Sequence, residues 1–101
     1  MIYISGKEKD YEKAEMWLKL KNEIPINPSN VIRSLPNPTE EMAMKVRFAL
    51  IEMCDSVLMI DGWKGSKTAK TELIYAKSIG KKINYQKYYK EFRKKGETDN
   101  D

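Results

Sequence analysis

The chain has 101 residues and a net charge of +4, which is the size of one domain with a small basic surplus. Hydrophobic residues make up 41% of the chain and charged residues 34%, so the composition is that of a globular protein rather than of a disordered one. The lack of histidine and the single cysteine exclude an internal disulfide, a zinc site and a Ser-His or Cys-His nucleophile pair. Catalysis would therefore depend on carboxylates, hydroxyls, lysines or a cofactor.

The N-terminal sequence, the length of the apolar runs and the cysteine count bear on the cellular location of the protein. The N-terminus "MIYISGKEKD" has no basic region followed by a long apolar run, so we expect no signal peptide. No apolar run approaches the roughly 20 residues of a membrane span. A lone cysteine, Cys54, is typical of a reducing compartment, so we expect a cytoplasmic protein. The basic surplus favours anionic partners in general and does not establish nucleic-acid binding.

The first two predicted strands flank a helix. Residues 2–5 form an apolar run that ends at Gly6, which predicts a buried strand. Asp10 is a candidate N-cap for the next helix, whose apolar stripe consists of Tyr11, Ala14, Trp17 and Leu18. Ile24 and Ile26 predict a very short strand that ends at Asn27-Pro28. Residues 31–38 contain two prolines and predict a loop.

A second helix is expected from Thr39, a good N-cap, to about Cys54. Apolar residues lie on two of its faces: Met42, Val46, Ala49, Leu50 and Met53 on one, and Met44, Phe48 and Ile51 on the other. A helix of this kind is buried on two sides. Either it lies in the centre of the fold, or its second face packs against another subunit.

The C-terminal half repeats the alternation. Residues 56–62 form a continuous apolar run closed by Asp61-Gly62, typical of a strand covered on both faces. A helix from about Ser66 to Ile79 ends at Gly80, and residues 81–85 predict a last strand. Beyond it, one apolar face of a short helix is formed by Tyr85, Tyr88, Tyr89 and Phe92, and the tail is expected to fray.

The order β-α-β-α-β-α-β-α predicts a short parallel sheet of about four strands with helices on both faces. Ligands of such folds bind outside the carboxyl ends of the strands. Three segments should meet at that edge: Ser5-Gly6, Asn27-Pro28 and Asp61-Gly62-Trp63. The start of the helix at Ser66 joins them.

Glu72 occupies an unusual position on that last helix. At about 100° per residue it falls between Ala76 and Ile79, inside the apolar arc and away from the lysines. A carboxylate there either lies at the rim of the packed face or points into a cavity. Burial would raise its pKa, and neighbouring hydrogen-bond donors would lower it.

The start of the same helix offers hydrogen-bond donors. Gly62, Gly65, Ser66 and Thr68 lie at or just before it, and free backbone N–H groups there suit an anion or a sugar hydroxyl. A plain strand-to-helix turn with a serine cap explains the pattern equally well. Two roles are open for Trp63 as well: its ring could stack on a base or cover the core.

Four stretches together resemble the DUF4406 group, which is similar to the nucleoside 2-deoxyribosyltransferase family. They are "IYISG" at 2–6, "INP" at 26–28, "CDSVLMIDGW" at 54–63 and "GSKTAKTELIYAKSIGKKI" at 65–83. The resemblance covers roughly residues 1–85. The region that follows, 86–101, is expected to add only the amphipathic helix and tail.

The resemblance implies a flavodoxin-like, Rossmann-like three-layer fold that binds a nucleoside or nucleotide. We expect no metal and no other cofactor. In the transferases the glutamate that matches Glu72 is the nucleophile that attacks the sugar. Residues matching Tyr3 and Gly6 line the sugar and phosphate side. Members commonly assemble so that a neighbouring subunit completes the site, which implies a homodimer or larger homo-oligomer.

Two departures from the family pattern concern activity. Arg47 stands where related sequences often carry an aspartate, and Ser66 stands where true transferases more often have an acidic residue. Asp61 is then the nearest remaining candidate acid, although an aspartate before glycine is also an ordinary turn residue.

Two functions follow, with a third less favoured. The chain either cleaves or transfers an N-glycosidic bond with Glu72 as nucleophile, or is an inactive nucleotide-binding protein, for example a phage-type sequestering or regulatory protein. Nucleic-acid binding through the lysines and tyrosines of "KKINYQKYYKEFRKK" is less favoured than docking of that helix on its own or a partner subunit.

Overall fold

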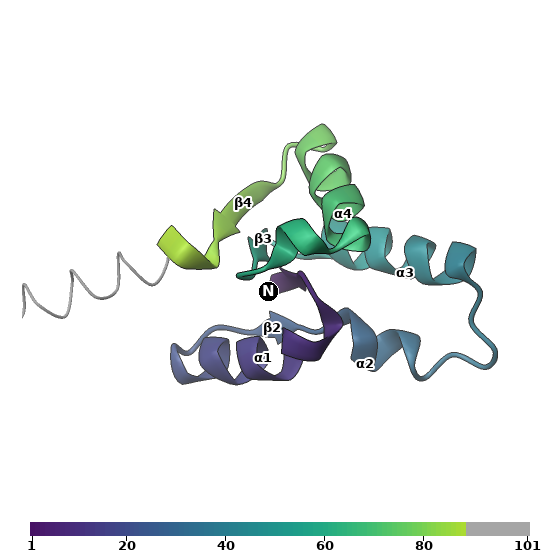
Figure 1. Cartoon of the computed structure of the whole chain (residues 1–101), viewed down its shortest axis with the longest axis horizontal. Coiled ribbons are helices and arrows are strands. Elements are labelled where there is room, and N and C mark those ends of the chain that lie inside the picture. Colours follow the sequence, from purple (N-terminus) through teal and green to yellow (C-terminus); the bar gives the residue numbers. More distant parts are fainter. Residues whose placement is uncertain (89–101) are drawn as a thin grey trace, which may run out of the picture.

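The protein is an α/β three-layer fold around a four-stranded, fully parallel sheet (Figure 1). The computed structural model describes residues 1–88. The strands follow the spatial order β2-β1-β3-β4 and are β1 (Ile2–Ser5), β2 (Pro25–Ile26), β3 (Ser56–Met59) and β4 (Lys82–Tyr85). The predicted fold class and strand positions are confirmed.

Four α-helices connect the strands and form the outer layers. They are α1 (Tyr11–Leu20), α2 (Pro28–Ile32), α3 (Glu40–Met53) and α4 (Lys67–Ser78), with short 3₁₀ turns at Glu8–Asp10 and Trp63–Gly65. In Figure 1, α1 lies at the bottom beside β2, α3 lies at the right at the height of β3, and α4 lies above α3. The strand order reverses between β1 and β3, which is where such folds bind ligands.

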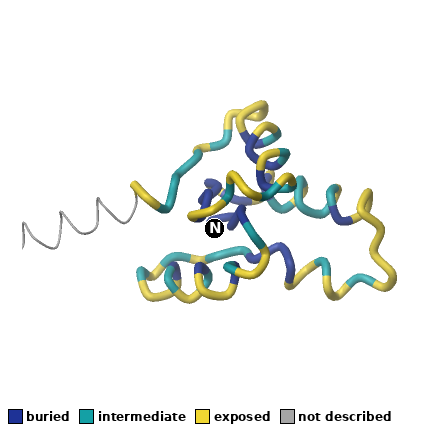
Figure 2. The backbone as a smooth tube through the Cα atoms, in the orientation of Figure 1, coloured by how far each residue is buried: buried dark blue, intermediate teal, exposed yellow. Residues whose placement is uncertain are grey.

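Each face of the sheet has its own core, and the deepest burial follows β1 and β3 (Figure 2). Because side chains alternate along a strand, odd-numbered residues of β1 and β3 face α3 and α4, and even-numbered ones face α1. The first core holds Tyr3, Ile51, Cys54, Val57, Met59, Ala69, Leu73 and Ala76. The second holds Ile2, Ile4, Tyr11, Ala14, Leu18, Leu58 and Ile60.

Two local predictions were wrong. Asp10 does not cap α1 with its side chain, because its backbone (φ −102°, ψ 0°) is already helical, whereas a capping residue needs an extended backbone. Residues 31–38 are not all loop, since α2 runs to Ile32. Two sequence features mark the start of α2. Asn27 is its N-cap, whose Oδ1 accepts from the Ser29 N–H at 3.0 Å, and a proline stands in its first turn.

The start of α3 is as predicted, but its burial is not. Thr39 Oγ1 accepts from the Met42 N–H at 3.1 Å. Ala43 and Ile51 are buried, whereas Met42 is 40% and Met53 66% exposed. The helix is therefore covered on one side only within the described chain, and the reading that it is simply central is wrong.

The C-terminal prediction is tested only in part. Tyr85 ends β4 rather than joining a helix, because its backbone pairs in register with Met59. Residues 86–88 begin a helical turn, while Tyr89, Phe92 and the tail lie outside the described residues. None of the helices within residues 1–88 has the length and apolar composition needed to cross a membrane.

Candidate functional site

Glu72 is at the centre of the face that α4 turns toward the sheet, and it has no exposed surface. Ala69, Leu73 and Ala76 surround it on that face, which places it inside the core rather than at its rim. Two hydroxyls from β1 hold the carboxylate: Tyr3 Oη donates to Oε2, and Ser5 Oγ donates to Oε1 at 2.7 Å. β1 and α4 thus form a three-residue polar cluster, which we call the Glu72 cluster.

Opposing effects act on the charge of Glu72. Burial raises the pKa of its carboxyl above the usual value, whereas the hydroxyls of Tyr3 and Ser5 and the positive charge of Arg47 lower it. Burial and the neighbouring carboxylate raise the pKa of the Tyr3 phenol, so this hydroxyl stays protonated and remains a donor. The cluster therefore stabilises the ionised form of an otherwise desolvated acid.

Arg47 reaches toward this cluster from α3. The residue that departs from the family pattern therefore supplies a positive charge where an acid was expected. Among residues 1–88, its Nη1 is buried and has no hydrogen-bond partner. A buried guanidinium N–H without an acceptor destabilises the fold. An anionic or carbonyl oxygen within hydrogen-bond distance of Nη1 would remove this cost.

Gly6 and the turn after β2 shape the edge through close packing and helix capping. A Cβ on Gly6 would lie 2.3 Å from Ile60 Cγ1, so glycine is needed for close packing there. Its carbonyl oxygen accepts from Tyr11 Oη at 3.1 Å. Asn27 and Pro28 are buried, and Asn27 uses its side chain to cap α2.

The donors at the start of α4 are partly occupied. Ser66 Oγ accepts from the Ala69 N–H at 3.1 Å, so its first role is that of an N-cap. Thr68 is half-buried in the first turn. Gly62 has φ +88°, a left-handed conformation that favours glycine and allows the sharp turn out of β3.

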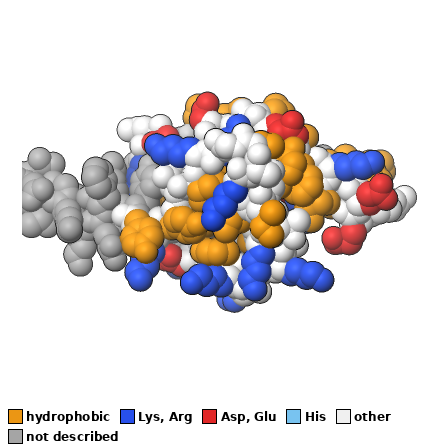
Figure 3. Space-filling view, turned by 90° about the horizontal axis from the view of Figure 1, so that it is seen from above, with side chains coloured by type: hydrophobic (Ala, Val, Ile, Leu, Met, Phe, Trp, Pro, Cys, Tyr) orange, Lys and Arg blue, Asp and Glu red, His pale blue; other side chains and the backbone are white. Residues whose placement is uncertain are grey.

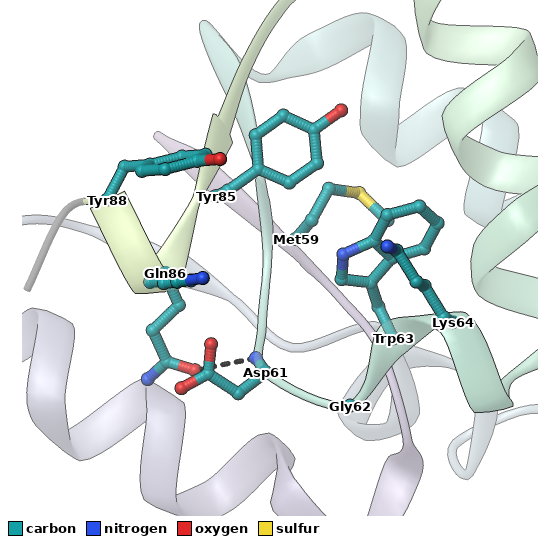
Figure 4. Close-up of a pocket in the computed structure, with 9 residues that line it drawn as sticks. Met59, Asp61, Gly62, Trp63, Lys64, Tyr85, Gln86 and Tyr88 are labelled. Carbon is teal, nitrogen blue, oxygen red and sulfur yellow. Dashed lines mark hydrogen bonds between the residues drawn. The ribbon is translucent and has the colours of Figure 1, made fainter.

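The other predicted residues line a separate cavity of about 480 Å³ at the carboxyl ends of β3 and β4, which we call the aromatic cavity (Figure 4). Its walls contain Met59, Asp61, Gly62, Trp63, Lys64, Tyr85, Gln86, Lys87 and Tyr88. The Asp61 N–H donates to Gln86 Oε1 at 2.8 Å. Tyr3, Ser5 and Glu72 do not line it.

Of the residues that line this cavity, the sequence predicted Asp61, Gly62 and Trp63 as site residues and missed the others. Tyr85 ends the fourth strand, so the rule that places ligands at carboxyl ends of strands could have identified it. Gln86, Lys87 and Tyr88 were assigned to a C-terminal helix instead. Together with Trp63 and Lys64 they give the cavity both aromatic and basic walls.

The side of the molecule that carries α4 has hydrophobic side chains across its middle, and its charged side chains lie mostly around the border, with basic atoms also over the middle (Figure 3). Within residues 1–88, no group of three or more His, Cys, Asp or Glu side chains is placed to hold a metal ion. The chemistry available at this edge is thus that of one buried carboxylate, hydroxyls, an arginine, lysines and aromatic rings.

The comparisons with known proteins agree with the motifs in the chain. Residues 2–85 match the family described as "Domain of unknown function (DUF4406)", and the match includes every strand and α-helix from β1 to β4. No curated protein and no solved structure matches the sequence. Since the family match covers most of the chain, the protein belongs to the DUF4406 family.

Proposed function

We propose that the protein binds a nucleoside or nucleotide at the carboxyl edge of the sheet and cleaves its N-glycosidic bond with Glu72 as the nucleophile. One observation carries the proposal: a fully buried carboxylate is held by two hydroxyls from β1 beside the point where the strand order reverses. Burial removes competing water, and the fixed donors orient the attacking oxygen.

The chemistry resembles retaining glycoside cleavage. An oxygen of the Glu72 carboxylate attacks the anomeric carbon, the carbon–nitrogen bond breaks, and its electron pair leaves with the base. The base takes a proton from Asp61 or from solvent. Water then hydrolyses the glycosyl ester and restores the carboxylate, or a second base accepts the sugar in its place.

Base release tests the proposal. The protein is incubated with nucleosides, deoxynucleotides and NAD, and the free base is measured by chromatography. Glu72→Gln should lower the rate by at least about 10³-fold, while Glu41→Gln, an exposed glutamate on α3, should leave it unchanged. Intact-mass analysis should find a glycosyl adduct on the wild type only. No release at high protein concentration, or equal release by Glu72→Gln, contradicts cleavage.

The second candidate is binding without cleavage, and the burial of Glu72 favours it. The carboxylate has no exposed surface, lies outside the aromatic cavity, and has Arg47 rather than an acid nearby. Native mass spectrometry of protein purified from cells should then find a bound nucleotide-like ligand. A clean apo mass, together with no thermal shift across a nucleotide panel, would argue against this candidate.

We also propose that the protein is a homodimer or larger homo-oligomer through α3. Its outer stripe, Met42, Val46, Ala49 and Met53, follows the i, i+4, i+7, i+11 spacing, and three of the four side chains are exposed. Light scattering at micromolar concentration should give at least twice the mass of the chain. Met53→Lys should lower it, and a monomer mass for the wild type would refute the proposal.

A further inference from the structure

The aromatic cavity has features that the Glu72 cluster does not use. Three aromatic rings line it, and no two of them are stacked face to face. The centroids of Trp63 and Tyr85 are 6.0 Å apart with a 43° angle between the rings, and those of Tyr85 and Tyr88 are 6.2 Å apart and nearly perpendicular. Ring faces left uncovered by each other suit a planar ligand, since stacking on an aromatic face is favourable and tolerant of ring type.

One wall of the cavity presents polar groups that suit the edge of such a ring. Gln86 Oε1 accepts from the Asp61 N–H, which fixes the amide and leaves its nitrogen as a donor. The Asp61 carboxylate, an acceptor, lies beside that amide in Figure 4. The amide donor of Gln86 suits a ring nitrogen or carbonyl acceptor at the edge of a heteroaromatic base.

The charges in the cavity suit an anion. Among the described residues that line it, Lys64 and Lys87 are basic and Asp61 is acidic, so these walls carry a net positive charge. Lys64 Nζ lies 5.9 Å from the centre of the Trp63 ring, close to where a stacked ligand would lie. A phosphate on the ligand would be attracted by both lysines.

We propose that the aromatic cavity is the subsite for the heteroaromatic base of a nucleoside monophosphate, with stacking by Trp63, Tyr85 and Tyr88. This inference rests on the proposed function, because it assigns the base of that ligand to a place. It also adds Tyr85, Gln86 and Tyr88 to the binding residues and makes the ligand phosphorylated rather than neutral.

The register of the sheet places this subsite next to Glu72. Ser5 pairs with Met59, and Met59 pairs with Tyr85, so the three side chains lie in one row on the α3–α4 face. Neighbouring strands are about 4.8 Å apart, which puts the Ser5 and Tyr85 columns roughly 10 Å apart. Met59 lies between them and has no exposed surface.

The Met59 side chain therefore separates the proposed base subsite from the Glu72 carboxylate. In Figure 4 its side chain points toward the Trp63 indole. A sugar attached to a base in the cavity would extend over Met59 toward Glu72. The unbranched thioether can change rotamer without a large cost, which lets the anomeric carbon approach the carboxylate.

Trp63 fluorescence tests the inference. A Trp17→Phe protein leaves Trp63 as the only tryptophan. The protein is titrated with AMP, UMP, adenine and ribose 5-phosphate. AMP and UMP should quench the fluorescence saturably at the lowest concentrations, adenine should quench it more weakly, and ribose 5-phosphate should not quench it.

Variants of the cavity residues extend the test. Tyr85→Ala should weaken AMP binding about tenfold or more. Tyr88→Ala, at a side chain that is 63% exposed, should weaken it without a change of fold. Tyr75→Phe, outside the cavity, should leave it unchanged.

The outcomes separate this inference from the proposed function. If AMP binds the wild type, Tyr85→Ala and Tyr88→Ala equally, the subsite is wrong and the proposed function stands. If AMP quenches Trp63 in a Tyr85-dependent way but no nucleoside or nucleotide is cleaved, the subsite stands and the proposed cleavage fails. Quenching by ribose 5-phosphate as strong as by AMP would overturn the assignment of the base to the cavity.

Discussion

The Glu72 cluster and the aromatic cavity lie at the same edge of one sheet and differ in almost every physical respect. The cluster is buried under α4, its oxygens are hydrogen-bonded, and it belongs to the core. The cavity is open, is lined by lysines and aromatic rings, and lies at the end of the sheet. The difference teaches that a polar group at the centre of the sheet is satisfied within the protein, whereas polar and aromatic side chains at its margin stay accessible.

The strand order explains this separation. β1 and β3 are the central strands and are covered on both faces, so a polar side chain there needs partners within the protein. β4 is the last strand of the described sheet and is only half-buried. The residues that follow it can remain polar and accessible. The comparison predicts that substitutions in the cluster change stability and that substitutions in the cavity change binding.

The largest expected effect comes from a matched pair of tyrosines. Tyr3→Phe removes the donor to a buried carboxylate and should lower the free energy of unfolding by about 2 kcal/mol. Tyr88→Phe removes a hydroxyl from an exposed side chain and should change it by less than about 0.5 kcal/mol. Urea unfolding measures both, and equal losses would break the comparison.

Two glycines give the next effect. Gly6→Ala would force a methyl group against buried Ile60 and should cost about 2 kcal/mol. A Cβ on Gly65 would meet only the end of the Lys7 side chain, which can move, so Gly65→Ala should cost less than about 0.5 kcal/mol. Thermal unfolding followed by circular dichroism distinguishes them. A Gly6→Ala protein as stable as wild type would contradict the close packing.

A smaller effect is expected at Ser66, between the two regions. Ser66→Ala removes the N-cap of α4 and should lower stability by about 1 kcal/mol. Ser66→Asp keeps a capping oxygen and should retain wild-type stability. If both variants are fully stable while nucleotide binding changes, Ser66 acts on the ligand and not as a cap.

The smallest expected effect is a pH dependence. The pKa of Glu72 is raised in the folded protein, so its contribution to stability is complete below the unfolded value of 4.5 and is lost as pH rises through the folded pKa. Wild type should lose stability relative to Glu72→Gln as the pH rises above 4.5. The donors and Arg47 oppose the effect of desolvation on the pKa, so the slope should be shallow. Denaturant titrations along a pH series measure it, and a slope of opposite sign would mean that the donors dominate.

Much of the fold could be predicted because local signals agreed with the global order. The apolar runs at 2–5 and 56–62 and the helix ends at Thr39 and Gly80 each pointed to the observed elements. Asp10 failed as a cap because a 3₁₀ turn precedes α1 and holds its backbone in a helical conformation. The short α2 was missed because its proline and polar residues, and the two prolines that follow it at 36 and 38, resemble a loop.

The candidate site was predictable only in pieces. Periodicity placed Glu72 on the apolar arc but left open whether it lay at the rim, since only the packing of β1 against α4 decides that. The family resemblance implied that Tyr3 lines the sugar side of the site, but it did not predict the bond between Tyr3 and Glu72. The division of the edge into a buried cluster and an open cavity depends on the register of Ser5, Met59 and Tyr85, which no local pattern specifies.

The bond between Tyr3 and Glu72 joins residues 69 positions apart and thereby links the first strand to the last helix before β4. Such a contact cannot form until almost the whole domain has been synthesised, and contacts of long sequence separation slow folding. A ligand that engages this bond would bind only the complete fold. Its binding energy would be added to the stability of the entire domain, which makes the melting temperature a sensitive detector in a search for that ligand.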